Sequence, residues 1–327
     1  MAERLKLRFA CGLYDRMRAL HAREIEPEGI ELDFVAMDSP RAIFDRMAGR
    51  LEFDMAEMSS SEFISRMGAG QCPFVALPVF PSRMFRHSYI CINTESGISR
   101  PRDLEGKRIG VALYTMTAAI WMRGLLQHDY GVDLSGVRWV QGSINSPGAH
   151  GEPSVMPLLR SVPIEINQSG KSLSQLLDEG AIDATMGTRL PSAMRDNPHI
   201  RRLFPDYREV EKQYYRRTGI FPIMHLVVIR KDVYERHPFI AASLYRAFCD
   251  SRDRAVAAMR QSPRDTMLPW ITSDLEEIDE VFGDGFWSYG LKTNRRTLKT
   301  LIAYMVEQSL IAEPIAVEDL FVPVGEP

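Results

Sequence analysis

The hydrophobic pattern in the first part of the chain alternates between strand-like and helix-like segments. Residues 5–11, 30–37 and 53–58 read as strands, and a helical segment follows each of them. The second helix is expected to begin at Ser39-Pro40, because serine caps a helix N-terminus and proline fits its first turn. The third is expected to open at Ser59–Ser61, with these side chains as N-caps. This β-α-β-α-β-α order predicts an α/β fold with a parallel sheet.

A second set of alternating elements follows. Strands are predicted at 109–111, 138–141 and 181–186, with helices from about 117 to 130 and over 172–179. Residues 142–163 are rich in glycine, proline and serine, which predicts an irregular loop. Towards the C-terminus, 234–259 and 295–310 have the periodicity of helices.

Two stretches, 77–92 and 219–230, share one order: a Phe-Pro pair, then a histidine, then an apolar strand. We interpret them as paired crossings between two lobes. Residues 1–92 and 219–327 would form the first lobe, with C-terminal helices, and 93–218 an inserted second α/β lobe. A ligand is then expected between the lobes, beyond the carboxyl ends of the strands.

Composition narrows the class of protein. The chain has 327 residues, enough for two domains, with 45% hydrophobic and 25% charged residues, as in soluble globular proteins. A net charge of −3 argues against a nucleic-acid partner. No apolar run spans a bilayer, no signal-peptide core is present, and the four cysteines form no metal-binding pair. We therefore expect a cytoplasmic protein with no membrane partner.

The first crossing, residues 77–92, holds the closest cluster of candidate ligand-binding residues. Arg83 and Arg86 are three residues apart beside Phe80 and Phe85. Guanidinium groups offer a planar fork of donors, so this cluster is a candidate receptor for an aromatic carboxylate. The alternative is an ordinary solvated basic turn before a strand.

Other candidates are the polar residues that follow predicted strands, where ligands bind in α/β folds. They are Tyr14, Arg16, Ser59, Ser60, Ser61, Tyr114, Thr115, Thr117 and Arg189. The two threonines lie at an expected helix N-terminus, which favours an anion, although plain N-capping would also explain them.

None of the seven histidines forms a ligand pair of the H-x-x-x-H or H-x-H kind, so we expect no metal. A site assembled from His87, His225 and a carboxylate stays open. His225 is the first catalytic candidate, because it lies beside the second crossing, and His87 is the second. Strand alternation puts His225 on the face of Ile223 and Val227, so it could instead be a core histidine. No nucleophile motif is present.

Several motifs together resemble one enzyme family. These are Tyr14-Asp15-Arg16, residues 80–87 and 219–225, Trp287-Ser288-Tyr289-Gly290 with Asn294-Arg295, and residues 318–323. The chain resembles type II periplasmic binding proteins over nearly its whole length, and more closely 4,5-dihydroxyphthalate decarboxylases, which are enzymes on that fold. The resemblance implies a cofactor-independent carboxy-lyase of phthalate degradation, oligomeric, that converts 4,5-dihydroxyphthalate to protocatechuate and carbon dioxide.

The implied substrate suggests roles for the candidates. An aryl carboxylate leaves once the carbon that bears it is protonated, so the site needs a general acid and a cationic anchor. His225 would be the acid, and Arg83, Arg86 and Arg189 the anchors; Tyr14 and the three serines would contact the hydroxyls. The rival hypothesis is a solute-binding protein without chemistry, since fold does not fix function. A third is a biosynthetic enzyme of the thiamine-pyrimidine precursor type.

Overall fold

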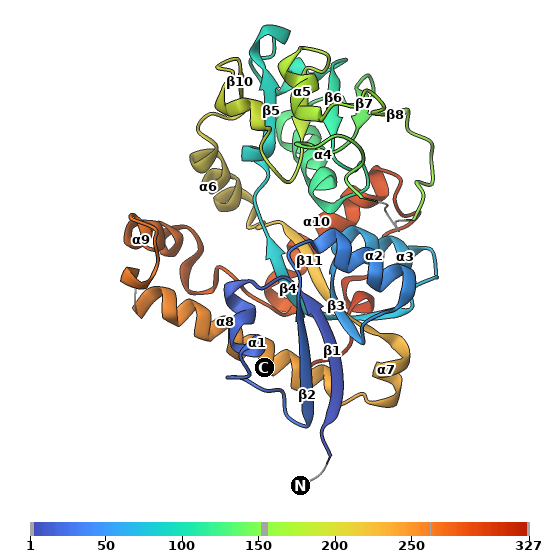
Figure 1. The fold of residues 1–327 in the computed structure, drawn as a ribbon, viewed down its shortest axis with the longest axis vertical. Helices are drawn as coiled ribbons and strands as arrows, with labels where there is room; N and C mark the ends of the chain where they lie inside the picture. Colours follow the sequence, from blue (N-terminus) through green and yellow to red (C-terminus); the bar gives the residue numbers. More distant parts are fainter. Residues whose placement is uncertain (1–2, 152–155, 262, 326–327) are drawn as a thin grey trace. The chain divides into compact units, whose positions relative to one another are not determined.

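The computed structural model describes residues 3–151, 156–261 and 263–325 (Figure 1). The chain divides into two compact units. Unit 1 comprises residues 1–83, 223–299 and 315–327, and unit 2 comprises residues 84–222 and 300–314. The predicted lobe boundaries lay between residues 92 and 93 and between residues 218 and 219. Residues 84–92, 219–222 and 300–314 were predicted in the first lobe but belong to unit 2.

Residues 84–92 belong to unit 2 because of strand pairing. Strand β5, Ile90–Asn93, pairs with β9 and β10 of unit 2, so the strand after the first crossing belongs to that sheet. The reason for residues 300–314 is packing at the end of helix α10. There, Gln308 accepts a hydrogen bond from Arg123 Nε, at 2.9 Å, in a helix of unit 2.

Unit 1 is built on a five-stranded sheet in the order β2-β1-β3-β11-β4. The strands β1, β2 and β3 are parallel, as predicted, whereas β11 runs antiparallel to both of its neighbours. The strands are β1 (Leu5–Cys11), β2 (Ile30–Ala36), β3 (Met55–Ser59), β4 (Phe74–Arg83) and β11 (Ile223–Arg230).

The helices of unit 1 follow its strands or lie in its C-terminal part. They are α1 (Arg18–His21), α2 (Pro40–Arg50), α3 (Ser60–Gly68), α7 (Lys231–Arg236), α8 (Ile240–Gln261), α9 (Ile271–Phe282) and α10 (Leu291–Glu307), whose end belongs to unit 2. Short 3₁₀ helices cover Asp15–Met17, Pro263–Asp265, Gly283–Gly285 and Val317–Leu320.

Of three local predictions for unit 1, two concern helix N-caps and one concerns the length of a helix. Ser39 caps α2 as predicted, its hydroxyl accepting from the N–H of Ala42 at 3.3 Å. Ser59 precedes α3 but makes no capping bond with its side chain; its hydroxyl lies 3.2 Å from that of Ser61. The single helix predicted over 234–259 is wrong: Pro238, which lacks an N–H, separates α7 from α8.

The sequence pattern also missed strand β4, which contains two prolines. Pro78 and Pro81 cannot donate to a sheet ladder, and proline is therefore confined to sheet edges. In unit 1, β4 stands at the edge of the sheet, beside β11. An edge position explains how ten consecutive residues can form a strand despite these prolines.

Unit 2 is built on a six-stranded sheet in the order β10-β5-β9-β6-β7-β8. Its remaining strands are β6 (Arg108–Val111), β7 (Arg138–Gln141), β8 (Ile164–Ile166), β9 (Ala184–Met186) and β10 (Ile200–Arg202). Its helices are α4 (Thr117–Tyr130), α5 (Leu173–Asp178) and α6 (Tyr207–Thr218), with 3₁₀ helices at His87–Tyr89, Thr94–Ser96, Pro101–Leu104 and Ser192–Arg195. The predicted loop over 142–163 is irregular where described; residues 152–155 lie outside the described residues.

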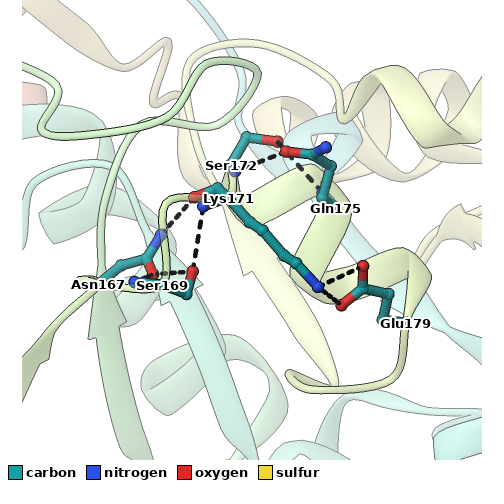
Figure 2. Close-up of polar contacts among 6 residues, drawn as sticks. All are labelled: Asn167, Ser169, Lys171, Ser172, Gln175 and Glu179. Carbon is teal, nitrogen blue, oxygen red and sulfur yellow. Dashed lines mark hydrogen bonds and ion pairs between the residues drawn. The ribbon is translucent and has the colours of Figure 1, made fainter.

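Helix α5 begins where side chains satisfy its first N–H groups. Ser172 accepts from the N–H of Gln175 at 3.2 Å, and the Gln175 side chain accepts in return from the N–H of Ser172 at 2.9 Å, a capping box (Figure 2). Lys171 and Glu179 form an ion pair across the same helix, at 2.7 Å. In the part of the chain that the structure describes, no helix combines the length and apolar character that crossing a bilayer requires.

Candidate active site

A fully buried carboxylate lies at the centre of the unit 1 sheet. Glu57 of β3 has no exposed surface and accepts four hydrogen bonds. The donors are the N–H of Gly12 at 3.0 Å, the thiol of Cys11 at 3.4 Å, the hydroxyl of Tyr14 at 2.8 Å and Nδ1 of His225 at 2.6 Å. Burial raises the pKa of Glu57, but the hydrogen bond and charge of His225 and the Gly12 and Tyr14 donors outweigh it, leaving that pKa lowered. Glu57 is therefore held as an anion.

His225 is placed by the neighbouring strand. In β11 it pairs with Ser59 of β3 and Ser82 of β4, and the register of the β4 pairing shifts on both sides of it. Such irregularities re-aim a side chain. As a result the His225 side chain is 19% exposed, whereas Ile223 and Val227, which alternation would put on the same face, are completely buried.

The two ring nitrogens of His225 have different surroundings. Because Nδ1 donates to Glu57, the second nitrogen, Nε2, is the one that can exchange a proton with a ligand. No hydrogen bond engages Nε2 among the residues that the structure describes. The ring of Phe44 packs edge-on against the imidazole, with centroids 5.0 Å apart. The arrangement is that of a histidine oriented by a carboxylate, with a free nitrogen to act as acid or base.

Tyr14 contributes a hydroxyl that keeps its proton. Burial, together with the nearby charge of Glu57, raises the pKa of Tyr14. Its position depends on Gly12: a Cβ on that glycine would meet the Tyr14 ring at 2.8 Å. A glycine two residues earlier is thus what lets the tyrosine fold back towards Glu57.

Arg16 lies on the other side of the Tyr14 ring. Its Cζ is 4.4 Å from the centroid of Tyr14 and 4.2 Å from that of Trp287, so the guanidinium is stacked between two aromatic rings. Nε donates to the carbonyl of Pro81 at 2.7 Å, and Nη1 pairs with Asp15 at 2.9 Å. This cation is fixed and 14% exposed. Through its contact with the Tyr14 ring, Arg16 lies next to the Tyr14–Glu57–His225 cluster.

The other unit 1 candidates are buried. Ser59, Ser60 and Ser61 are each less than 10% exposed, and Ser59 is the cross-strand neighbour of His225. Arg83 is 5% exposed, so the alternative of a solvated turn is wrong for it. Its Nη1 donates to the carbonyl of Ser288 at 3.0 Å, and this bond holds the segment that carries Trp287.

In unit 2, Arg86 of the first crossing is also buried, and Phe85 is half-buried. Arg86 is 5% exposed, and burial lowers its pKa to about 10. Its Cζ is 5.3 Å from the centroid of Tyr89. Phe85 lies against Phe221, with ring centroids 4.9 Å apart. Neither side chain belongs to a solvated turn.

His87 lies in an aromatic cluster of unit 2. It is 1% exposed, and its ring centroid is 5.3 Å from those of Phe204 and Tyr214. Burial, followed by the charge of Arg217, lowers the pKa of His87 to about 4. At neutral pH this imidazole is uncharged and lacks the acidic proton of an imidazolium, which is the environment of a core histidine rather than of a general acid.

The polar residues at the start of α4 form a separate group in unit 2. Thr117 is the first residue of the helix and Thr115 precedes it, as predicted. Tyr114 is 7% exposed, and the buried guanidinium of Arg123 stacks on it, with Cζ 3.7 Å from the ring centroid. Arg189 is exposed. Among the described residues, no group of three His, Cys, Asp or Glu side chains is arranged to hold a metal ion.

Sequence comparison decides the family. No family model matches the chain. The chain is 36% identical over 324 residues to a protein named 4,5-dihydroxyphthalate decarboxylase from Comamonas testosteroni, covering 98% of this chain and 97% of that protein. A protein of the same name from Pseudomonas putida is 37% identical over 214 residues, covering 65% of this chain and 82% of its own. The chain belongs to the 4,5-dihydroxyphthalate decarboxylase family.

Solved structures support the fold of this family member. The aliphatic sulphonate binding protein SsuA from Escherichia coli matches with a TM-score of 0.56 at 11% identity, covering 100% of this chain and 94% of SsuA. A sulfonate-binding SsuA from Methylobacillus flagellatus matches with a TM-score of 0.54 at 16% identity, covering 99% and 93%. The predicted periplasmic-binding-protein-like fold is confirmed, as is the resemblance drawn from the motifs.

Two buried residues of this decarboxylase family member, Glu57 and Arg123, were not among the candidates predicted from the sequence. Glu57 lies in the segment Phe53-Asp54-Met55-Ala56-Glu57-Met58, which was predicted to be a strand. An acidic residue in the middle of an interior strand was the available signal, because such a group requires compensating donors. Arg123 had a similar signal, a cation within the otherwise apolar part of α4.

Proposed function

We propose that this chain catalyses the non-oxidative decarboxylation of 4,5-dihydroxyphthalate to protocatechuate and carbon dioxide. The observation that carries the proposal is the His225–Glu57 pair, with Nδ1 bound at 2.6 Å and Nε2 left to exchange a proton. Family membership supports the substrate, since two relatives carry the name of this activity. The fold alone would suit a solute-binding protein equally well.

Decarboxylation requires that one proton be added to the ring carbon that bears the departing carboxylate. In 4,5-dihydroxyphthalate each hydroxyl is para to a carboxylate, so protonating the ring carbon that bears the carboxylate places positive charge where oxygen shares it. His225 would donate the proton from Nε2 to that carbon. The bond to the carboxylate then breaks, its electron pair restores the aromatic ring, and carbon dioxide leaves. Solvent returns the proton to the imidazole, so one proton is consumed in each turnover.

Glu57 would support this step electrostatically. An imidazolium gains stability from an anion on its far side, and a buried carboxylate provides that at short range. Because Glu57 is held as an anion by its other donors, it is available for this at neutral pH. The same bond fixes the orientation of the imidazole.

Arg16 would bind the carboxylate that remains on the ring. It is a fixed cation, stacked on the tyrosine that hydrogen-bonds Glu57. Tyr14, with its proton retained, and Ser59 offer hydroxyls for the phenolic groups. The remaining proposed substrate contacts are Ser60, Ser61, Arg83, Phe85, Arg86, Tyr114, Thr115, Thr117 and Arg189. We also propose that the enzyme works in the cytoplasm as a homo-oligomer; its four cysteines are all free thiols, as a reducing compartment favours.

The test is turnover with isotopic labelling. Purified protein is incubated with 4,5-dihydroxyphthalate in D₂O, and carbon dioxide and the aromatic product are quantified. The proposal expects equal amounts of both, with one deuterium in the product, ortho to the remaining carboxylate. Phthalate, which has no hydroxyl to share the charge, should bind without reacting. Binding of 4,5-dihydroxyphthalate without any carbon dioxide would favour the solute-binding hypothesis instead.

A further inference from the structure

Helix α2 of unit 1 places an aromatic ring against the imidazole of His225. The ring belongs to Phe44, and the two ring centroids are 5.0 Å apart with their planes inclined at 81°, an edge-to-face arrangement that aromatic pairs favour. Phe44 is 5% exposed, and α2 packs on strand β3, which carries Glu57. The imidazole therefore meets a carboxylate from one element and an aromatic ring from another.

A single hydrogen bond does not fix the orientation of an imidazole. The bond from Nδ1 to Glu57 fixes one atom, whereas the torsion between Cβ and the ring of a histidine has broad minima, so the ring can still turn. The backbone of His225 does not supply this constraint, because its pairing with β4 shifts register on both sides and its side chain is 19% exposed. A packed ring beside the imidazole restricts that rotation.

Phe44 has a fixed neighbour of its own. Arg41, one turn earlier in α2, lies over the Phe44 ring, with Cζ 5.3 Å from the ring centroid. The Arg41 side chain is 13% exposed and pairs with two carboxylates: Asp45 of the same helix, and Glu62 of α3, at 3.1 Å, whose side chain has no exposed surface. Because two acids hold Arg41, loss of the charge of either one leaves this cation anchored by the other.

We propose that Phe44 is a positioning residue for His225, whose ring holds the imidazole in the orientation in which Nδ1 meets Glu57 and Nε2 stays available. The inference rests on the proposed function, in which His225 is the acid; Phe44 itself exchanges no proton. Proton transfer depends on geometry, and a misplacement of about 1 Å can cost about 100-fold in rate. A loosened imidazole should therefore lower kcat and spare KM, since Arg16 provides the proposed substrate anchor.

The kinetic test compares two variants of α2. Phe44→Leu removes the ring but keeps a buried apolar side chain, and it should lower kcat about tenfold or more, with KM within about twofold of the wild-type value. Ile43→Ala is the matched control, at a completely buried aliphatic residue of the same helix. It removes more apolar volume than Phe44→Leu does, so it should lower the melting temperature at least as much, with kcat within about twofold of wild type.

The orientation of the imidazole is measured without substrate, by NMR of protein labelled with nitrogen-15 in histidine. The signals of His225 are those that His225→Asn lacks. At alkaline pH, wild type and Ile43→Ala should show one tautomer, with the proton on Nδ1, where it is bonded to Glu57. Phe44→Leu should show a mixture of tautomers or signals broadened by exchange.

Three outcomes would overturn the proposal. They are an unchanged His225 spectrum in Phe44→Leu, an equal loss of kcat in Ile43→Ala, and the same disturbance of the spectrum in Ile43→Ala. Failure of the proposed function would look different. An altered spectrum in Phe44→Leu with unchanged kcat would support the positioning of the imidazole by Phe44, and would show that His225 is not the acid of the reaction.

Discussion

Nδ1 of His225 lies 2.6 Å from Oε1 of Glu57, a carboxylate with no exposed surface. The two residues come from adjacent antiparallel strands, β11 and β3, which are 168 residues apart in the chain. The pairing of β11 with β3 thus brings together a histidine and a carboxylate that lie far apart in the sequence.

Glu57→Gln should lower kcat with little change in KM. The amide keeps the shape of the side chain but removes the charge that stabilises an imidazolium. Replacing the corresponding acid in a catalytic triad by its amide costs about 10⁴-fold in kcat, so a loss of at least about 100-fold is expected here. Steady-state kinetics on 4,5-dihydroxyphthalate measures it.

Glu62→Gln is the matched control for that change. Glu62 is a second buried carboxylate of unit 1, paired with Arg41 at 3.1 Å and Arg66 at 3.6 Å. Its substitution should lower the melting temperature but leave kcat nearly unchanged. If both variants lose stability and activity in parallel, Glu57 is a structural carboxylate and not part of the reaction.

Gly12→Ala should impair turnover through Tyr14. The new Cβ would lie 2.8 Å from the tyrosine ring, so the ring must move away from Glu57. Losing one hydrogen bond to a charged acceptor typically costs about 1.5–3 kcal/mol, and kcat/KM should fall about ten- to a hundredfold if the cluster is catalytic. Gly49→Ala is the control: a Cβ at Gly49 meets nothing within 4 Å, and helix α2 should gain about 0.5–1 kcal/mol. Equal kcat/KM values for Gly12→Ala and Gly49→Ala would show that Tyr14 does not contribute to catalysis.

Arg16→Met should raise KM for 4,5-dihydroxyphthalate about ten- to a hundredfold, because a charged hydrogen bond to a carboxylate is worth about 1.5–3 kcal/mol. Met keeps an apolar body between Tyr14 and Trp287, so the melting temperature should change little. Arg50→Met, at the exposed end of α2, serves as the control for a lost surface charge. An unchanged KM for Arg16→Met would assign the anchor to another arginine.

A pH prediction follows from Glu211 in unit 2. Burial raises its pKa to about 7, from 4.5, while the N–H of Ser88 donates to it at 3.2 Å. Because the folded state holds this proton more tightly, the contribution of Glu211 to stability is present below about pH 4.5 and is lost as the pH rises to about 7. Glu211→Gln has no proton to lose. Above pH 7 it should therefore be more stable than wild type, by at most about 3 kcal/mol.

Urea unfolding at several pH values measures this difference. His87, whose Nδ1 lies 3.9 Å from Glu211, is present in both proteins. Glu209→Gln on the same helix is the control, because Glu209 is exposed and its pKa is lowered by its bonds to Lys212 and Gln213. A constant difference between wild type and Glu211→Gln from pH 4.5 to 8 would contradict the prediction.

Much of the fold could be predicted from local pattern. Strands β1, β2 and β7, helices α2, α4 and α5, and the capping of α2 by Ser39 follow from alternation, periodicity and the residues at helix starts. Strand β4 could not, because prolines argue against a strand unless the edge position is known. The break at Pro238 had a visible signal in the proline itself.

The site was only partly predictable, for a physical reason. Sequence placed Tyr14, Arg16 and His225 in one candidate set, and the structure joins them through Glu57. The pairing of β11 with β3 is a long-range contact, and no local pattern encodes it. His87 looked equivalent to His225 in its motif, but its surroundings are aromatic rings without a carboxylate in hydrogen-bonding contact, so its pKa falls to about 4.

Single-turnover decarboxylation by His225→Asn shows whether His225 delivers the proton to the ring. Asparagine keeps a donor of similar size but cannot deliver a proton near neutral pH, and general acid catalysis is typically worth about 100- to 10,000-fold. With excess enzyme and 4,5-dihydroxyphthalate, substrate binding should be nearly preserved, while the release of carbon dioxide should slow by at least about 100-fold. Release within a few-fold of the wild-type rate would mean that a group other than His225 protonates the ring.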